Sequence, residues 1–452
     1  MPRRFWIETL GCPKNQVDSD KLVGTLLADG LAPAEAPGEA DLIVVNTCAF
    51  IEDARQESID TILQLDDHRR PGSRLVVSGC LAERYGDELA EALPEVDLVA
   101  PFGVPVNLAG EPATGVTVTL GPRRGPNAAS TIPAVPSFDL LNLPRPPATA
   151  PWAYVKIAEG CDRACGFCAI PSFRGPQRSR TRQAIMAEVE ALGVQEVVLV
   201  AQDLASYGRD QGRGEREIVP LVAEVAGLVP RVRLLYLYPS DLTDRLVDAI
   251  CAAGVPYFDL SLQHVSPPLL RRMRRWGDGE RFLARIADIR RREPEAAFRS
   301  NFIVGYPGET EADHDHLLRF VEEAQLDWCG FFAFSREEGT YAAGLDGGVA
   351  DGLVKERLAE LGELQDTITA TRRDRLIGTG VDVLVDAVGV GRTFREAPEI
   401  DGIVEVPTEL EPGTFASLTV SAAAGPDLVA VRCPEPAVST TPHGPPGPSR
   451  AR

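Results

Sequence analysis

Residues 152–168 read WAYVKIAEGCDRACGFC, a strand-like run that ends at three closely spaced cysteines. Cys161, Cys165 and Cys168 have the spacing C-x3-C-x2-C and follow directly on the predicted strand. Thiolates this close can hold three irons of a cubane iron–sulfur cluster and leave the fourth iron open for a substrate. A zinc site is the alternative, but zinc normally takes four ligands and no fourth Cys or His lies near these three in the sequence.

Outward from this motif, apolar runs alternate with helical patterns from residue 151 to 375. Candidate strands span 152–160, 196–203, 233–239, 257–263, 299–307 and 328–335, with helices between them, for example at 181–192 and 313–324, and a last helix at 353–375. Six strands in this order predict a partial or complete α/β barrel. A doubly wound open sheet is the alternative.

Residues 1–110 carry a second set of cysteines in a βαβαβ pattern, which predicts a parallel sheet. The predicted strands span 5–12, 41–48 and 74–80, and the helices 17–29, 51–65 and 83–93. Cys12, Cys48 and Cys80 each stand at the carboxyl end of one strand. Because these ends meet at one edge of a parallel sheet, we expect the three thiols to converge on a second metal site. Three separate buried structural cysteines are the alternative.

The remaining segments differ in composition. Residues 111–150 are rich in Pro, Ala and Ser and predict a linker, partly packed through Phe138, Leu140 and Leu141. Residues 376–434 contain short β-rich runs separated by turns and predict a small β-barrel. Residues 435–452 are Pro-rich and predict a disordered tail.

Composition limits the class of protein. The 452 residues are 44% apolar and 25% charged, which is ordinary for a globular chain, and the formal net charge is −20. No apolar run is long enough to span a membrane and the first residues lack the apolar core of a secretory signal, so we expect a cytoplasmic protein. Nine cysteines, an odd number, argue against a disulfide framework. Cys251, Cys329 and Cys433 are expected to be small core residues.

Seven stretches together resemble the methylthiotransferase family of the radical S-adenosylmethionine superfamily, and within it the RimO type that acts on ribosomal protein uS12. They are LGCPKNQVDSD (10–20), EGCDRACGFCAIPSFRG (159–175), AQDLASYGRD (201–210), LYLYPS (235–240), LQHVSPPLLRRMRRWG (262–277), FIVGYPGET (302–310) and GRTFREAPEIDG (391–402). The resemblance covers nearly the whole chain except the linker and the tail. It implies an N-terminal methylthiotransferase domain, a radical S-adenosylmethionine barrel and a C-terminal TRAM barrel.

The resemblance also implies a mechanism. The cysteines Cys161, Cys165 and Cys168 would bind a [4Fe-4S] cluster that cleaves S-adenosylmethionine to a radical, which abstracts hydrogen from the β-carbon of an aspartate of uS12. The cysteines Cys12, Cys48 and Cys80 would bind an auxiliary [4Fe-4S] cluster that presents sulfur, which a second S-adenosylmethionine methylates. An electron donor such as flavodoxin or ferredoxin and a sulfur donor are implied as partners. Expected contacts to S-adenosylmethionine are Phe167, Gln202, Asp203, Gln263 and Gly305, with His264 beside them.

A tRNA methylthiotransferase is the alternative function, and a non-catalytic iron–sulfur protein is a third. Residues 376–434 hold nine acids and three arginines, a net charge of −6. This balance suits a basic ribosomal protein better than RNA, so no direct tRNA substrate is expected. The basic run Arg271, Arg272, Arg274 and Arg275 is expected to be a solvated helix face.

Overall fold

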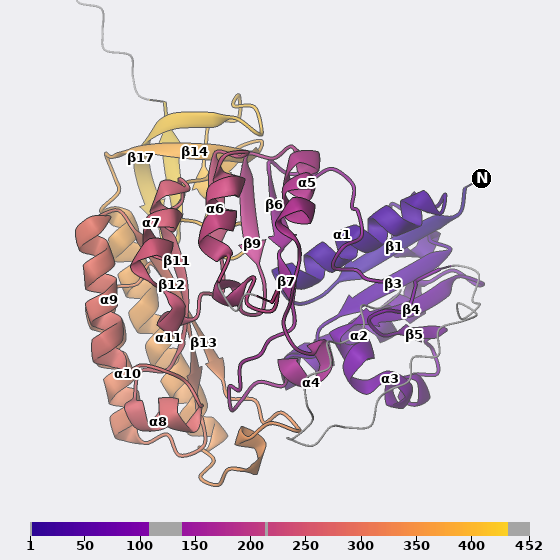
Figure 1. Ribbon diagram of the computed structural model, residues 1–452, viewed down its shortest axis with the longest axis horizontal. Coiled ribbons are helices and arrows are strands. Elements are labelled where there is room, and N and C mark those ends of the chain that lie inside the picture. The colour runs from indigo at the N-terminus through magenta and orange to yellow at the C-terminus, as the bar shows by residue number, and fades with distance from the viewer. Residues whose placement is uncertain (1, 108–137, 213–215, 433–452) are drawn as a thin grey trace, which may run out of the picture.

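The computed structural model describes residues 2–107, 138–212 and 216–432. In these ranges the chain forms an N-terminal sheet, a central partial barrel and a small C-terminal barrel, in that order (Figure 1). This architecture confirms the fold class that the sequence predicts. Residues 111–137 of the expected linker, and the expected tail, lie outside the described residues. The described end of the linker is packed, with Leu140 and Leu141 buried.

The N-terminal sheet is parallel, with strand order β2-β1-β3-β4-β5. Its elements are β1 (Arg4–Thr9), α1 (Pro13–Ala28), β2 (Ala32–Pro33), η1 (Pro37–Glu39), β3 (Leu42–Thr47), α2 (Glu52–His68), β4 (Arg74–Gly79), α3 (Cys80–Ala92) and β5 (Leu98–Ala100). Helices cover both faces, so all six residues of β3 are buried, and the strand begins with the apolar run Leu-Ile-Val-Val. The three predicted strands are present, and the short edge strands β2 and β5 are additional.

The central part consists of two parallel three-stranded sheets, ordered β10-β9-β6 and β11-β12-β13. A bridge between Leu237 and Leu260 links them, which makes a six-stranded partial barrel. The strands are β6 (Trp152–Lys156), β7 (Ala158–Glu159), β8 (Arg178–Ser179), β9 (Glu196–Val200), β10 (Arg231–Leu234), β11 (Tyr257–Gln263), β12 (Ala297–Val304) and β13 (Trp328–Ala333). The helices are α4 (Ile170–Arg174), α5 (Arg182–Leu192), η2 (Leu204–Ser206), α6 (Ile218–Ala226), η3 (Pro239–Asp241), α7 (Asp244–Ala252), α8 (Pro267–Arg272), α9 (Gly279–Arg292), α10 (Glu311–Ala324), η4 (Ala342–Gly344) and α11 (Asp351–Asp374).

The C-terminal part is a closed five-stranded barrel, ordered β14-β15-β16-β18-β17. Its strands are β14 (Gly380–Ala387), β15 (Val390–Arg392), β16 (Val404–Glu405), β17 (Phe415–Ala424) and β18 (Asp427–Val431). The sequence predicts four of these strands. It misses β15, because that strand has only three residues with a glycine in the middle.

The C-terminal barrel packs against the amino ends of the central strands (Figure 1). Glu196, the first residue of β9, pairs with Arg233 at 2.7 Å and with Arg392 of β15 at 3.3 Å. Trp328, which begins β13, donates its indole N–H to the carbonyl of Arg395 at 2.8 Å. The carboxyl ends of the same strands therefore stay free of the C-terminal barrel, and they face the cysteines.

Candidate functional site

Cys161, Cys165 and Cys168, the central triad, lie in the loop between β7 and α4. Burial raises the pKa of Cys161 to about 11 and that of Cys168 to about 12, and the neighbouring sulfurs add to both shifts. The three sulfurs are thus close enough to repel one another as thiolates. Such a group becomes fully ionised only against a positive charge, which a bound iron cluster would supply. The donor set therefore fits an iron–sulfur cluster.

The loop of the central triad is fixed by its backbone and by two arginines. The Gly166 N–H donates to the Met273 carbonyl at 2.8 Å. A Cβ at Gly166 would lie 3.1 Å from the Arg272 carbonyl oxygen, so a larger residue would push the loop away. The backbone N–H of Arg163 and the Nη1 of Arg275 lie 3.4 Å from the sulfurs of Cys161 and Cys165.

Cys12, Cys48 and Cys80, the N-terminal triad, meet at the carboxyl edge of the first sheet. Cys12 caps α1, Cys48 follows β3, and Cys80 begins α3 after β4. A Cβ at Gly11, whose φ is +97°, would lie 2.8 Å from the Cβ of Cys48, so this approach requires glycine. The sequence pattern predicts that these three residues lie at one edge of the sheet, and in the structure they do.

The three cysteines of the N-terminal triad differ in their electrostatic environment. Burial, together with the nearby sulfurs of Cys80 and Cys12, raises the pKa of Cys48 to about 12. Burial also opposes ionisation of Cys12, but the charges of Lys14 and Arg174 and the first backbone N–H groups of α1 lower its pKa overall. Within residues 2–107, 138–212 and 216–432, no three His, Cys, Asp or Glu side chains are placed to hold a single metal ion. Both triads hold three thiols, as a cubane bound at three corners requires.

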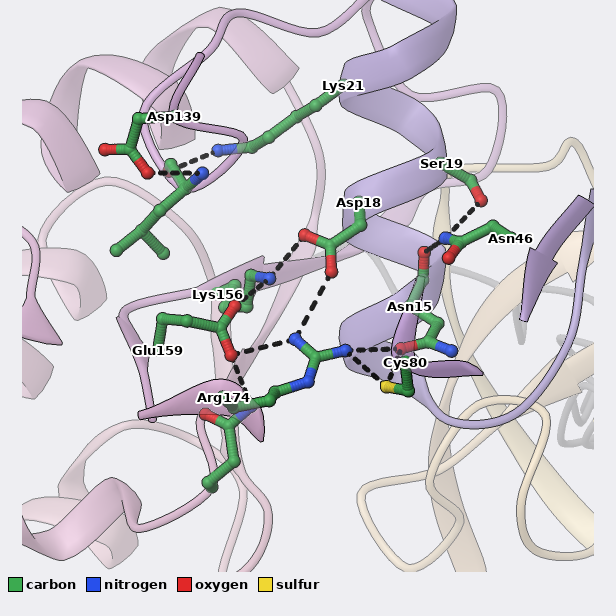
Figure 2. Close-up of polar contacts among 12 residues, drawn as sticks. Asn15, Asp18, Ser19, Lys21, Asn46, Cys80, Asp139, Lys156, Glu159 and Arg174 are labelled. Atoms are coloured by element: carbon green, nitrogen blue, oxygen red, sulfur yellow. Dashed lines mark hydrogen bonds and ion pairs between the residues drawn. The ribbon is translucent and has the colours of Figure 1, made fainter. Parts of the chain in front are cut away.

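Arg174, the last residue of α4, joins the two cysteine-bearing domains (Figure 2). Its Nη1 donates to Glu159 Oε1 at 2.8 Å and lies 3.5 Å from Asp18 Oδ2. Its Nη2 donates to Asn15 Oδ1 at 2.8 Å and to the sulfur of Cys80 at 2.9 Å. Burial disfavours the charge, but the negative partners hold the pKa of Arg174 well above its ordinary value. One side chain of the central domain thus contacts the N-terminal triad directly.

Lys156 balances the remaining charge at the seam, which is the contact between the N-terminal and central domains around Arg174. It is fully buried on β6 and pairs with Asp18 and, at 2.6 Å, with Glu159. Although burial opposes it, Arg174 and Lys156 lower the pKa of Glu159 below its usual range. Two cations and two carboxylates therefore neutralise one another, as buried charges must.

A second set of contacts joins the same two domains through the loop after β13. Glu337, in the loop after β13, is 2% exposed and accepts from Arg55 of α2 at 2.5 Å and from Arg84 of α3 at 2.7 Å. The Oγ of Ser335 in the same loop accepts from the backbone N–H of Glu52 at 3.2 Å. The N-terminal domain is therefore held by both halves of the partial barrel.

Of the residues expected to contact S-adenosylmethionine, Gln202 and Asp203 follow β9 and have polar atoms that are not fully engaged. Gln202 donates to Glu159 at 2.7 Å, and Asp203 accepts from Arg163 at 2.6 Å and from Ser206 at 2.7 Å. Among the described residues, Gln202 Oε1 and Asp203 Oδ1 are buried without a hydrogen-bond partner. Both atoms remain available to a ligand at the end of β9.

The other expected contacts are more constrained. Gln263 has a φ of +71° where the register of β11 against β12 shifts. Gly305 donates its N–H to Glu309 at 2.5 Å, and a Cβ there would lie 2.6 Å from Val354 Cγ2. Phe167 packs on the central core. His264 is buried with Nε2 unpartnered in the described structure, and burial lowers its pKa to about 3, so the ring is neutral.

Sequence reasoning missed the charged residues around the triads. Arg174, Glu159 and Asn15 stand inside the quoted stretches 159–175 and 10–20, where an unassigned charge or amide beside a cysteine was the available clue. The expectation for the basic run was wrong for Arg275. This residue is partly buried, because it donates to the Ser261 carbonyl and to Cys165.

Of the cysteines outside the triads, Cys251 and Cys329 pack against the central core. Cys433 lies outside the described residues. No helix in the described ranges is long and apolar enough to cross a bilayer.

An α/β barrel with three cysteines after its first strand is the arrangement of a radical S-adenosylmethionine enzyme, and family comparisons agree. Residues 155–321 match the radical SAM superfamily, residues 4–101 the family described as "Uncharacterized protein family UPF0004", and residues 377–432 the TRAM domain.

Full-length relatives define the family further. The chain is 42% identical to the ribosomal protein uS12 methylthiotransferase RimO of Salinispora tropica, over 97% of each chain. It is 40% identical to the RimO of Kineococcus radiotolerans, over 97% of this chain and 98% of the relative, and 41% identical to that of Streptomyces coelicolor, over 95% and 96%. The chain belongs to the RimO family of methylthiotransferases. The cofactors of this family are S-adenosylmethionine and two [4Fe-4S] clusters.

Solved structures resemble the chain more distantly. The radical methyltransferase TsrM from Kitasatospora setae, with cobalamin and a [4Fe-4S] cluster bound, is 15% identical, covers 74% of this chain and 75% of its own, and has a TM-score of 0.47. The cobalamin-dependent radical enzyme OxsB is 12% identical, with a TM-score of 0.44 over 81% of this chain and 56% of its own.

Proposed function

We propose that this protein methylthiolates the β-carbon of an aspartate in ribosomal protein uS12. The observation that carries the proposal is the pair of cysteine triads, one in each of two domains that Arg174 joins through its contacts with Glu159 and Cys80. This reaction needs a radical source and a sulfur source, and the seam joins the two domains whose cysteines would bind them. Relatives that align with nearly the whole chain carry the name of this activity.

We assign the central triad to the cluster that binds S-adenosylmethionine and the N-terminal triad to the auxiliary cluster. When bound, these groups supply a carbon-centred radical and the sulfur that is transferred, chemistry that protein side chains alone do not provide. Cys161, Cys165 and Cys168 are thus proposed as both catalytic and metal-binding, and Cys12, Cys48 and Cys80 as metal-binding.

The residues at the strand ends would orient S-adenosylmethionine. The unpartnered Oε1 of Gln202 and Oδ1 of Asp203 can each accept a hydrogen bond from a donor group of the ligand. Gln263 has a positive φ at the irregular end of β11, and the positive φ of Gly305 and its close contact with Val354 keep the backbone after β12 in a fixed conformation. Phe167 stands between two of the cysteines and offers a ring for packing. These roles are proposals for all five residues.

The seam would protect the reaction from water. Arg174, Lys156, Asp18 and Glu159 are engaged with one another at the seam, while Glu337 joins the same two domains through the loop after β13. A radical generated between the two domains would therefore meet the substrate before solvent.

The chemistry also indicates two partners, a location and one excluded substrate. Reductive cleavage consumes an electron, so we propose an electron carrier such as flavodoxin or ferredoxin, and a separate sulfur donor must replenish the transferred atom. We propose the cytoplasm as the location, because ribosomal proteins are made and assembled there. We propose no direct tRNA substrate.

The acidic C-terminal barrel supports a basic protein as the partner, with one correction to the sequence view. Glu396 is fully buried against Arg373, and Asp401 is held by Tyr257 at 2.6 Å. Neither faces solvent. The exposed acids of the barrel are Asp382, Glu399, Glu405, Glu409 and Glu411, whereas Arg432 is its exposed base. The outer face stays acidic, which favours attraction of a basic protein over RNA.

The proposal is tested by mass spectrometry of uS12. Protein uS12 from cells that contain this gene should carry one methylthio group on an aspartate, and uS12 from cells without it should not. Restoring the gene with Cys161, Cys165 and Cys168 changed to Ala should leave uS12 unmodified. A methylthiolated adenosine in tRNA together with unmodified uS12 would contradict the proposal.

Arg174 should tune the auxiliary cluster. In protein whose central triad is replaced by Ala, the Arg174→Met change should lower the reduction potential of the remaining cluster, because it removes an N–H donor and a positive charge from the Cys80 sulfur. Arg174→Lys should give a smaller decrease. The measurement is a redox titration followed by electron paramagnetic resonance.

Asp18→Asn is the control for Arg174, since it weakens the seam but keeps the contact of Arg174 with Cys80. It should leave the potential near that of the parent. An equal decrease in Asp18→Asn and Arg174→Met, or no decrease in Arg174→Met, would assign Arg174 to seam stability alone.

The exposed acids of the C-terminal barrel should speed encounter with uS12. Changing Glu405, Glu409 and Glu411 to Lys should lower the association rate by about tenfold at low salt, and less at physiological salt, where charges are screened over about 8 Å. Stopped-flow binding at several salt concentrations measures this. The control changes three exposed acids of α11, Glu356, Glu363 and Asp366, to Lys. If both variants slow equally, the effect comes from net charge and the barrel has no docking role.

A further inference from the structure

Lys14 differs from the other lysines of the chain. Lys21 and Lys156 are buried and paired with carboxylates, and Lys355 is exposed. Lys14 is half-buried, and its Nζ lies 3.5 Å from the centroid of the Tyr236 ring. Among the residues that the structure describes, no carboxylate lies within ion-pair distance of it. A partly buried cation that faces an aromatic ring and lacks an acid is a site for an anion.

Tyr236 is built into this position at a cost in backbone strain. Its φ is +64°, a region that bulky residues rarely adopt, and its N–H donates to Asp259 Oδ2 at 2.9 Å. Burial raises its pKa well above the ordinary value, and the sulfur of Cys12 adds to the shift, which places the ring near that cysteine. Asp259 is itself paired with Arg299, so it does not neutralise Lys14. The strained turn holds a ring beneath the ammonium group.

The segment that carries Tyr236 reaches from one triad to the other. Tyr238, two residues on, lies under the guanidinium groups of Arg163 and Arg275, each 3.9 Å from the ring centroid. The backbone N–H of Arg163 contacts the sulfur of Cys161, and the Nη1 of Arg275 contacts the sulfur of Cys165. Tyr236 therefore lies near Cys12, and Tyr238 packs against two arginines that lie at the loop of the central triad. Lys14 stands at the Cys12 end of this span, two residues from the cysteine.

We infer that Lys14 binds the side-chain carboxylate of the substrate aspartate. This inference rests on the proposed function, in which the β-carbon of an aspartate receives sulfur from the auxiliary site. That carbon is bonded to the carboxylate carbon, so the group that binds the carboxylate must lie beside the N-terminal triad. Lys14 meets this condition through its place next to Cys12.

The other cations at the seam are already engaged. Arg174 has four acceptors, Arg163 holds Asp203 and Asp241, and Arg275 donates to the Ser261 carbonyl. Lys14 can add a charge-assisted hydrogen bond to an incoming carboxylate without breaking an existing ion pair. A contact of this kind distinguishes aspartate from asparagine, whose neutral amide forms a weaker bond with an ammonium group. It also sets the reach, since the longer side chain of glutamate would place a different carbon at the reacting position.

A purely structural role for Lys14 is the competing explanation, because its charge also stabilises the thiolate of Cys12. The two roles differ in what they predict for the substrate. A structural role alters cluster content and leaves the preference for aspartate unchanged. A binding role alters that preference and leaves the cluster intact.

The test measures binding of purified uS12 to the reconstituted enzyme under anaerobic conditions without S-adenosylmethionine. Wild-type uS12 is compared with uS12 in which the modified aspartate, identified by mass spectrometry, is changed to Asn. The parent enzyme should bind the aspartate form about tenfold more tightly than the Asn form. In Lys14→Met the two forms should bind equally, and Lys14→Arg should restore most of the preference. Lys355→Met is the matched control and should behave like the parent.

Iron content and the paramagnetic spectrum of the auxiliary cluster are measured on the same samples. An unchanged tenfold preference in Lys14→Met would overturn the inference. So would a Lys14→Arg variant that keeps the auxiliary cluster and still lacks the preference, because restoring a cation at this position would then not restore binding of the aspartate. Failure of the proposed function looks different: the parent enzyme would then neither bind nor modify uS12, whichever residue stands at position 14.

Discussion

The site depends on one buried guanidinium group. Arg174 lies between two domains and has hydrogen-bond or ionic contacts with Asp18 and Asn15 on one side, Glu159 on the other, and the sulfur of Cys80. A buried charge costs several kcal/mol unless it is paired, so this geometry is maintained only while both domains supply their acceptors. The contacts that join the domains therefore also hold Arg174 against Cys80 of the N-terminal triad (Figure 2).

Parallel strands explain where the two triads lie. In both sheets the cysteines follow the carboxyl ends of strands, where loops are free to hold ligands. The amino ends of the central strands are occupied instead by the C-terminal barrel, through Glu196, Arg392 and Trp328. The central domain thus has its cysteines at one end and the C-terminal barrel at the other. The acidic outer face of that barrel remains exposed and can bind a partner.

Much of this arrangement could be predicted from the sequence, because its determinants are local. Apolar runs marked the strands, and the position of Cys12, Cys48 and Cys80 after three of them placed the thiols at one edge. What could not be predicted depends on tertiary contact. Nothing local shows that Arg174 reaches Cys80, that Arg275 turns inward to Cys165, or that Glu396 is buried against Arg373. The short strand β15 was missed because it is stabilised by its neighbours in the barrel and has little propensity of its own.

The central claim is that the two triads carry separate parts of one reaction. The most direct measurement takes the variant with Cys12, Cys48 and Cys80 changed to Ala, reconstituted without oxygen and reduced in the presence of S-adenosylmethionine and uS12. The account predicts about four irons per chain instead of about eight, continued formation of 5′-deoxyadenosine, and no methylthiolated uS12. Loss of 5′-deoxyadenosine while the central cluster stays intact, or formation of methylthiolated uS12, would contradict it.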